Sequence, residues 1–143
     1  MSDLPPLPTG DPPPLPPFWD GGPPPIDRAA VTPTVDDVAA LERTRTIGAG
    51  GEDVGTFTDQ THPTNDEVET LTDEALDEVL GQLPDHIDPL WYPAIRRLVV
   101  LRAATSVEAS YYREQSPAAA WTERFATDLA ALQRAIPDAT WIA

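Results

Sequence analysis

His62 and His86 are the side chains of this sequence best suited to metal binding or to acid–base chemistry near neutral pH. Aspartates stand close to both, with Asp59 before the first and Asp85 and Asp88 around the second. A zinc site needs three or four converging ligands, and the sequence has neither a His-x-x-x-His pair nor any cysteine. Both histidines fall near prolines in predicted loops. We therefore interpret them as solvated loop residues and predict no metal site.

The other motifs that could carry chemistry are incomplete. A glycine-rich run at 48–51 is reminiscent of a phosphate cradle, but a P-loop also needs a lysine, and the chain has none. Glu52 and Asp53, which follow it, would repel phosphate. The acid spacing of this loop does not fit an EF-hand, and no nucleophile elbow is present. We predict no catalytic residue, no cofactor and no enzyme activity.

The composition is strongly acidic, with a net charge of −15 and a pI of about 4.1. All nine basic residues are arginines, and no Lys or Arg lies between residues 46 and 95, against twelve Asp and Glu. This balance disfavours nucleic-acid binding, which depends on cations at phosphates, and binding to an anionic membrane. The first residues have neither a basic start nor an apolar stretch, so we expect no secretory signal and a cytoplasmic site of synthesis.

Helical periodicity predicts an all-α fold, a small bundle of about four helices. The predicted helices span about 35–44, 65–80, 90–114 and 117–136. The third contains the most apolar long run and has no single polar face, so we expect it to be the central helix, covered on several sides. Its start stays open between Pro89, with Asp88 as a possible N-cap, and Pro93. It is too short and too rich in arginine to span a bilayer.

Capping signals mark the beginnings of the other helices. Thr34 with Asp37, and Thr64 with Glu67, have the spacing of capping boxes. Ser116 stands before a proline, which predicts an N-cap followed by proline in the first turn. The first helix is short and would not be stable alone. We expect it to dock on the core.

Two segments outside the helices are distinctive. Residues 1–33 hold twelve of the 18 prolines and predict an irregular, extended arm before a helical domain of residues 34–143. Residues 46–63 predict a long Gly-rich loop, in which 44–47 and 54–58 could pair as a small hairpin. Such a hairpin is marginal in water, so we expect contact with a neighbouring molecule to order the loop.

Two blocks of sequence carry a family resemblance that covers roughly residues 34–136. The run from Val54, Val-Gly-Thr-Phe-Thr-Asp-Gln-Thr-His-Pro-Thr-Asn-Asp-Glu-Val-Glu, leads into an acidic helix. The run from Arg96 to Gln115, rich in arginine and apolar residues, precedes a Ser-Pro-capped last helix. Together they resemble the head-to-tail adaptor, or head completion, proteins of tailed phages that infect actinobacteria. The proline-rich arm is not part of that pattern.

The resemblance implies a helical virion protein of the head–tail junction, assembled in the host cytoplasm. Members of that family form a homo-oligomeric ring, typically of twelve subunits, beneath the portal. The ring joins the portal to the stopper or tail, and DNA passes through it without sequence-specific binding. The sequence itself does not tell which face would line the channel.

Six apolar residues are the candidate contacts with partner proteins. They lie in the arm, in the long loop and at the C-terminal end of the sequence: Phe18, Trp19, Val54, Phe57, Trp141 and Ile142. The alternative interpretation is a monomeric acidic interaction module that uses its proline-rich segment as a linear motif, because Pro-Pro-Leu-Pro runs are similar to ligands of WW and SH3 domains.

Overall fold

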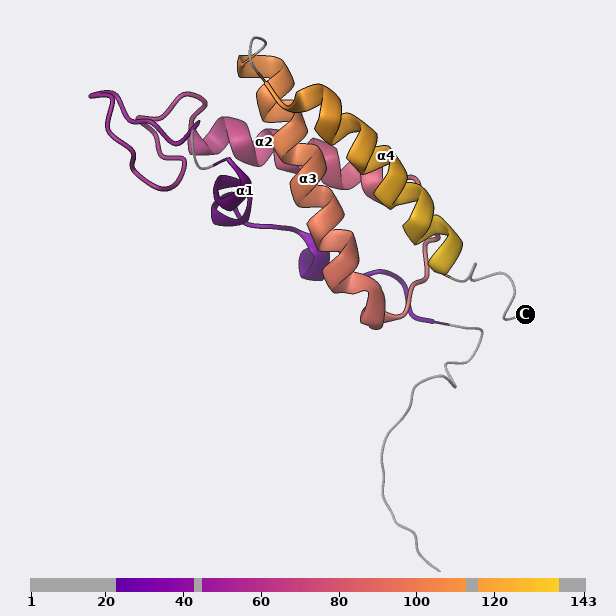
Figure 1. Ribbon diagram of the computed structural model, residues 1–143. Helices are drawn as coiled ribbons and strands as arrows, with labels where there is room; N and C mark the ends of the chain where they lie inside the picture. The colour runs from indigo at the N-terminus through magenta and orange to yellow at the C-terminus, as the bar shows by residue number, and fades with distance from the viewer. Residues whose placement is uncertain (1–22, 43–44, 113–115, 137–143) are drawn as a thin grey trace, which may run out of the picture.

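The computed structural model describes residues 23–42, 45–112 and 116–136 of the 143-residue chain, and its fold is all-α. The four α-helices are α1 (Val35–Leu41), α2 (Asn65–Leu80), α3 (Tyr92–Tyr111) and α4 (Ala118–Ala135), as Figure 1 shows. Two short 3-10 helices, η2 (Arg28–Val31) and η4 (Pro89–Trp91), complete the helical elements. No strand is present among these residues. The predicted bundle of about four helices is confirmed.

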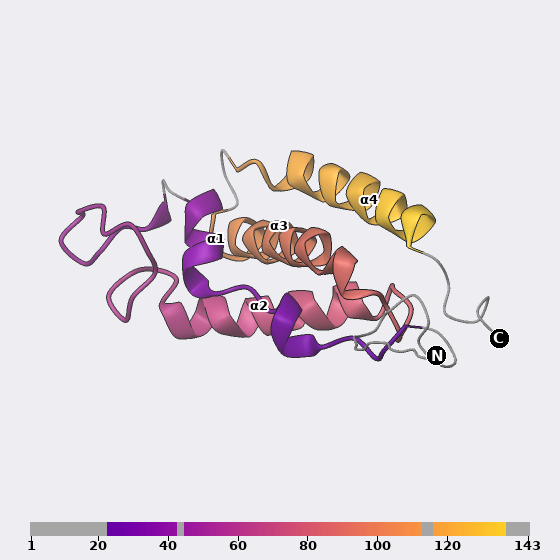
Figure 2. The same cartoon turned by 90° about the horizontal axis from the view of Figure 1, so that it is seen from below.

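Helix α3 is the centre of the fold. In Figure 2 it lies between α2 on one side and α4 on the other, while α1 crosses near one end. Helix α3 contacts α1, α2, α4 and η2. Its buried side chains point in every direction around its axis, which is why its sequence has no polar face. The expectation that this helix is covered on several sides is confirmed.

Both predicted capping boxes form. At the start of α1 the Thr34 hydroxyl accepts a hydrogen bond from the Asp37 N–H, and the Asp37 carboxylate accepts one from the Thr34 N–H. Thr64 and Glu67 make the same reciprocal pair at the start of α2. These contacts satisfy N–H groups that a helix leaves without internal partners. Helix α1 ends at Leu41, earlier than the predicted residue 44.

The start of α3 combines the two predicted alternatives. The Asp88 carboxylate accepts a hydrogen bond from the Leu90 N–H and so caps η4. The chain continues directly from η4 into α3, with Pro93 in the first turn of α3, where a missing N–H costs no hydrogen bond. Before α4, the Ser116 hydroxyl accepts a hydrogen bond from the Ala118 N–H, although the helix itself begins one residue later than predicted.

The helical domain begins earlier than the predicted boundary at residue 34. The Ile26 N–H donates to the Asp85 carbonyl at 3.0 Å, and the Ile87 N–H donates to the Pro24 carbonyl at 3.1 Å. Val31, in η2, is fully buried in the core. Residues 24–33 are thus part of the folded domain, because backbone pairing and one buried valine hold a segment whose prolines indicated an extended arm.

The loop between α1 and α2 extends away from the helices, as Figures 1 and 2 show. A tight turn closes its tip, where Gly48 pairs with Glu52 and Thr46 with Val54 through backbone hydrogen bonds of 2.8 and 2.9 Å. The predicted hairpin is reduced to a single antiparallel bridge between Ile47 and Asp53. None of the helices described here is long and apolar enough to cross a membrane.

Candidate functional site: a groove beside an acidic helix

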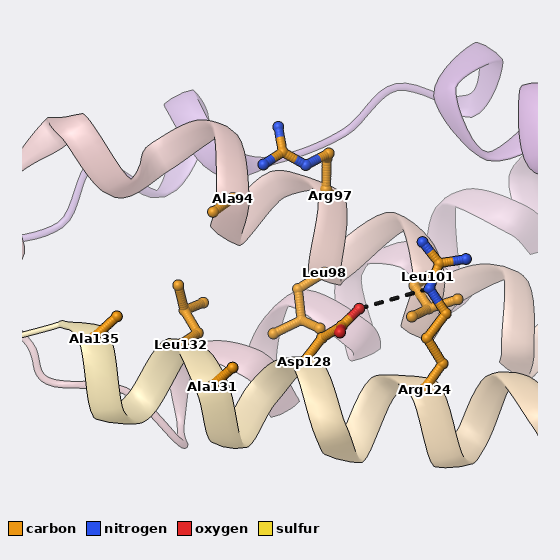
Figure 3. Close-up of a pocket in the computed structure, with 9 residues that line it drawn as sticks. All are labelled: Ala94, Arg97, Leu98, Leu101, Arg124, Asp128, Ala131, Leu132 and Ala135. Carbon is orange, nitrogen blue, oxygen red and sulfur yellow. Dashed lines mark ion pairs between the residues drawn. The ribbon is translucent and has the colours of Figure 1, made fainter.

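Two adjoining hollows lie along the face of α3 that α1 and α4 leave open. The larger, of about 580 Å³, is bounded by α1, the start of α3 and Arg124 of α4. The smaller, of about 350 Å³, lies between α3 and α4 and is drawn in Figure 3. Three residues line both: Arg97, Leu101 and Arg124. We call the two together the arginine groove.

The arginines of this groove differ in their partners. Arg96 donates to the Asp37 carboxylate at 2.7 Å and so fastens α3 to the cap of α1. Arg124 pairs with Asp128 on its own helix at 3.6 Å, the dashed contact in Figure 3. Arg97 has no ion pair with any residue of the described part of the chain, and its guanidinium points away from α4. The groove therefore offers one exposed cation whose charge is not compensated locally.

The floor and rim of the groove are mainly apolar near α1. Leu41 is 37% exposed there, and Tyr92 and Val100 are half-buried along the same hollow. An apolar lining beside an uncompensated cation is a composition found at protein-binding surfaces.

The acidic side of the molecule is formed by α2. Its exposed carboxylates are Asp66, Glu67, Glu69, Asp73, Glu74, Asp77 and Glu78. Three of them have partners: Glu67 caps its own helix, Asp77 pairs with Arg28, and Glu78 pairs with Arg102. A hollow of about 420 Å³ opens between α2 and the chain that leads into the first turn of α1, and it is lined by Asp36, Glu69 and Asp73 among threonines, a proline and Val35.

A buried charged cluster joins the end of α1 to α3. Arg45 makes two hydrogen bonds of 2.9 Å with the Glu108 carboxylate and lies 4.0 Å above the ring of Tyr112. The Ser116 hydroxyl donates to the same carboxylate at 2.8 Å. Burial opposes ionisation of Glu108, but the hydrogen bonds from Arg45, Glu42 and Ser116, together with the charge of Arg45, outweigh it and hold the pKa of Glu108 below the ordinary value.

Glu42 lies beside this cluster, and its pKa is shifted in the opposite direction to that of Glu108. It is 2% exposed, and no hydrogen-bond donor reaches either of its carboxyl oxygens. Burial first, and then the neighbouring Glu108 carboxylate, raise the pKa of Glu42 to about 9. A carboxyl group in such surroundings keeps its proton at neutral pH and can then donate to Glu108. Both carboxyl groups of the cluster are buried and bound up in contacts within the chain, so we interpret the cluster as a structural link between the loop, α1, α3 and the start of α4.

The predicted contact residues of the loop have different surroundings. Val54 is 37% exposed on the projecting loop, close in sequence to the bridge at Asp53. Phe57 is only 3% exposed and belongs to the core of its own chain. Its side chain is therefore not available to a partner in this conformation. Its position explains how the base of the loop is held to the helices.

The remaining predicted contacts fall where the structure gives no description. Phe18 and Trp19 in the arm, and Trp141 and Ile142 near the C-terminal end, lie outside the described residues. They remain predictions from sequence.

The two histidines are separated and serve the fold. His62 is exposed and packs edge to face against Tyr111, with ring centroids 5.2 Å apart, and its carbonyl accepts a hydrogen bond from the Tyr112 hydroxyl. His86 forms a backbone bridge with Pro25. Among the described residues, no three His, Asp or Glu side chains lie close enough to hold a metal ion.

The sequence contained a partial signal for the groove and none for the buried cluster. Two adjacent arginines within an apolar helix, Arg96 and Arg97, indicated a face that is not wholly buried. Glu42 and Glu108 are 66 positions apart, and no local pattern connects two residues at that separation.

Compared with known proteins, the chain matches no family model, no curated protein and no solved structure.

Proposed function

We propose that this chain is a structural virion protein of the head–tail junction of a tailed phage. In this role copies of the chain form a ring that joins the portal to the stopper or tail and lets DNA pass. The proposal starts from the resemblance of the block that begins at Val54, and of the block from Arg96 to Gln115, to phage adaptor proteins.

The observation that carries the proposal is the loop between α1 and α2. It extends from a small helical core, and its apolar residues Ile47 and Val54 are 39% and 37% exposed. In a free chain these apolar side chains stay in contact with water. A neighbouring subunit or the portal would cover them, so the loop supports a role in assembly.

The charge of the chain is compatible with a DNA channel. With a net charge of −15 and no lysine, its surface would repel phosphates and would not hold the passing duplex. A small core also gains stability from assembly, because binding to partners favours the folded state.

Analysis of purified particles tests the proposal. We expect the protein in virions by mass spectrometry, and a rotationally symmetric collar on the portal in a cryo-EM reconstruction. If the protein occurs only as a free monomer in the host cytoplasm and is absent from particles, the proposal is wrong.

Deletion of residues 1–22 separates this role from that of a monomeric acidic module with a proline-rich linear motif. The deletion ends before Pro24, whose carbonyl already belongs to the fold. An adaptor should keep a folded core that binds the portal. A linear-motif module should lose its partner entirely.

A further inference from the structure

We propose that the arginine groove receives the acidic face of α2 from a second copy of this chain. Copies would then associate head to tail, with a different surface on each side of the contact. This inference rests on the proposed ring, for which it names the lateral contact between subunits.

The groove needs a partner that brings negative charge. Asp37 and Asp128 are the acids that line it, and each is already paired with an arginine, Arg96 and Arg124 respectively. Arg97 is exposed where the two hollows meet and, among the described residues, has no acidic partner. Arg134 also has no ion pair with a described residue, but of the two only Arg97 lines the groove. Its electrostatic complement is a carboxylate from outside the fold.

The acidic face of α2 supplies that complement. Asp66, Glu69, Asp73 and Glu74 are exposed, and none has an ion pair with a described residue. Glu69 and Asp73 border a hollow of about 420 Å³, which leaves room for the end of an arginine side chain. The charges of the two surfaces are therefore complementary.

The fold prevents this contact within one chain. Helices α2 and α4 lie on opposite sides of α3, as Figure 2 shows, and no residue of α2 lines the groove. The groove is formed by α1, α3 and α4. The two surfaces can meet only between molecules. Because they differ, the contact is heterologous, and such contacts generate rings when the rotation closes.

The charges set the register of the contact, and the apolar part of the groove adds to its affinity. An exposed ion pair contributes only about 0.2–1 kcal/mol, so the Arg97 contact alone would not hold two copies together. Leu41 and Val100 offer apolar area in the same groove. Burial of that area excludes water from the ion pairs around it.

Cysteine cross-linking of the full chain tests which two surfaces meet. The protein has no cysteine of its own, so every disulfide comes from the introduced residues. Ala40→Cys places a thiol on the exposed rim of the groove, and Asp73→Cys places one on the acidic face. Ala126→Cys, also an exposed alanine, but on α4 and outside both hollows, is the matched control. Under mild oxidation, a mixture of the first two variants should form mixed dimers well above the control mixture. The Ala40→Cys variant alone should stay at the control level.

Two results would overturn the inference. One is a symmetric contact, in which Ala40→Cys cross-links to itself as efficiently as to Asp73→Cys. The other is a yield of mixed dimers from Ala40→Cys and Asp73→Cys that never exceeds the yield with the Ala126→Cys control, either in concentrated solution or in purified particles. The cross-linking also separates this inference from the proposed function. If particles contain the protein but the cross-link does not form, the virion role stands and the proposed contact is wrong. If the cross-link forms but the protein is absent from particles, the contact stands and the virion role is wrong.

Charge reversal provides an independent measurement. Arg97→Glu should weaken self-association about tenfold in sedimentation experiments, and the same change at the exposed, unpaired Arg134 should leave it unchanged. A chain that carries both Arg97→Glu and Asp73→Arg should recover association. Equal effects of Arg97→Glu and Arg134→Glu would show that only net charge matters and would contradict the docking.

Discussion

At the scale of single residues, the most consequential group is the buried carboxyl of Glu42. It stands beside Glu108, whose charge is compensated by Arg45, and no neighbouring group donates a hydrogen bond to its oxygens. If both carboxylates were ionised at this buried position, the cost of removing them from water would exceed the stabilisation that the single charge of Arg45 provides. One of the two carboxyl groups therefore stays protonated in the folded chain. Because that proton is lost on unfolding at neutral pH, the free energy of unfolding depends on pH.

The sign of that dependence follows from the two states of Glu42. Unfolded, Glu42 ionises near its ordinary pKa of 4.5, whereas burial and Glu108 raise its pKa to about 9 in the folded chain. Between these values the folded state binds one more proton, so this group lowers stability as the pH rises. Glu42→Gln should therefore become more stabilising relative to the wild type from pH 5 to pH 8, by at most about 1.4 kcal/mol per pH unit.

Denaturant unfolding of both proteins at several pH values measures this difference. Glu123→Gln, at an exposed position of α4, is the matched control and should give no pH-dependent difference. A constant difference between Glu42→Gln and the wild type across the range would show that Glu42 is ionised in the fold.

At the scale of elements, α3 depends on close packing on several sides at once. Ala103 and Ala104 are fully buried, together with Val99 and Val107, where neighbouring helices approach. Small side chains at these positions allow the close approach, since interiors have few voids larger than a water molecule. Helix α1 has seven residues and is held by its capping box and by Arg96. Its stability comes from these contacts and not from its own length.

Enlargement of one of these small residues tests the packing of α3. Ala104→Leu should lower the free energy of unfolding by about 1–3 kcal/mol, because the added atoms have no space among the surrounding helices. Ala109→Leu is the same change at an exposed position of the same helix and should be close to neutral. The unfolding midpoints in urea compare the two. Similar midpoints would mean that α3 is not tightly enclosed around Ala104.

At the scale of the whole molecule, the segment before α1 closes one end of the bundle. Ile26 packs partly buried against the core, and Val31 is buried completely. The Asp27 N–H donates to the Tyr92 hydroxyl at 2.8 Å, and Arg28 pairs with Asp77 at 2.6 Å. The segment thus links the start of α3 to the later part of α2.

Two truncations measure what this segment contributes. A chain that begins at residue 34 should be less stable than one that begins at residue 23 by about 2 kcal/mol or more, the effect of removing Val31 and part of Ile26 from the core. Thermal or denaturant unfolding of the two truncated chains provides the comparison. Equal stability would place the start of the folded domain at residue 34, as the proline content had indicated.

The sequence by itself determined the helices, because their signals are local. Apolar spacing along residues 65–80, and the hydroxyl and carboxylate three positions apart at Thr64 and Glu67, act within one or two turns. The lack of a polar face along α3 likewise required that it be covered. Helix ends were less well predicted, since the last turn of a helix depends on what its neighbours offer.

Only the tertiary structure decided which distant residues meet. It packed Phe57 into the core, joined Pro24 and Ile26 to the turn before α3, and brought Glu42 beside Glu108. It also left Arg97 without an acidic partner among the described residues while pairing Arg96 one position earlier. Such contacts depend on the direction in which each helix leaves its loop, and no pattern of neighbouring residues encodes that direction.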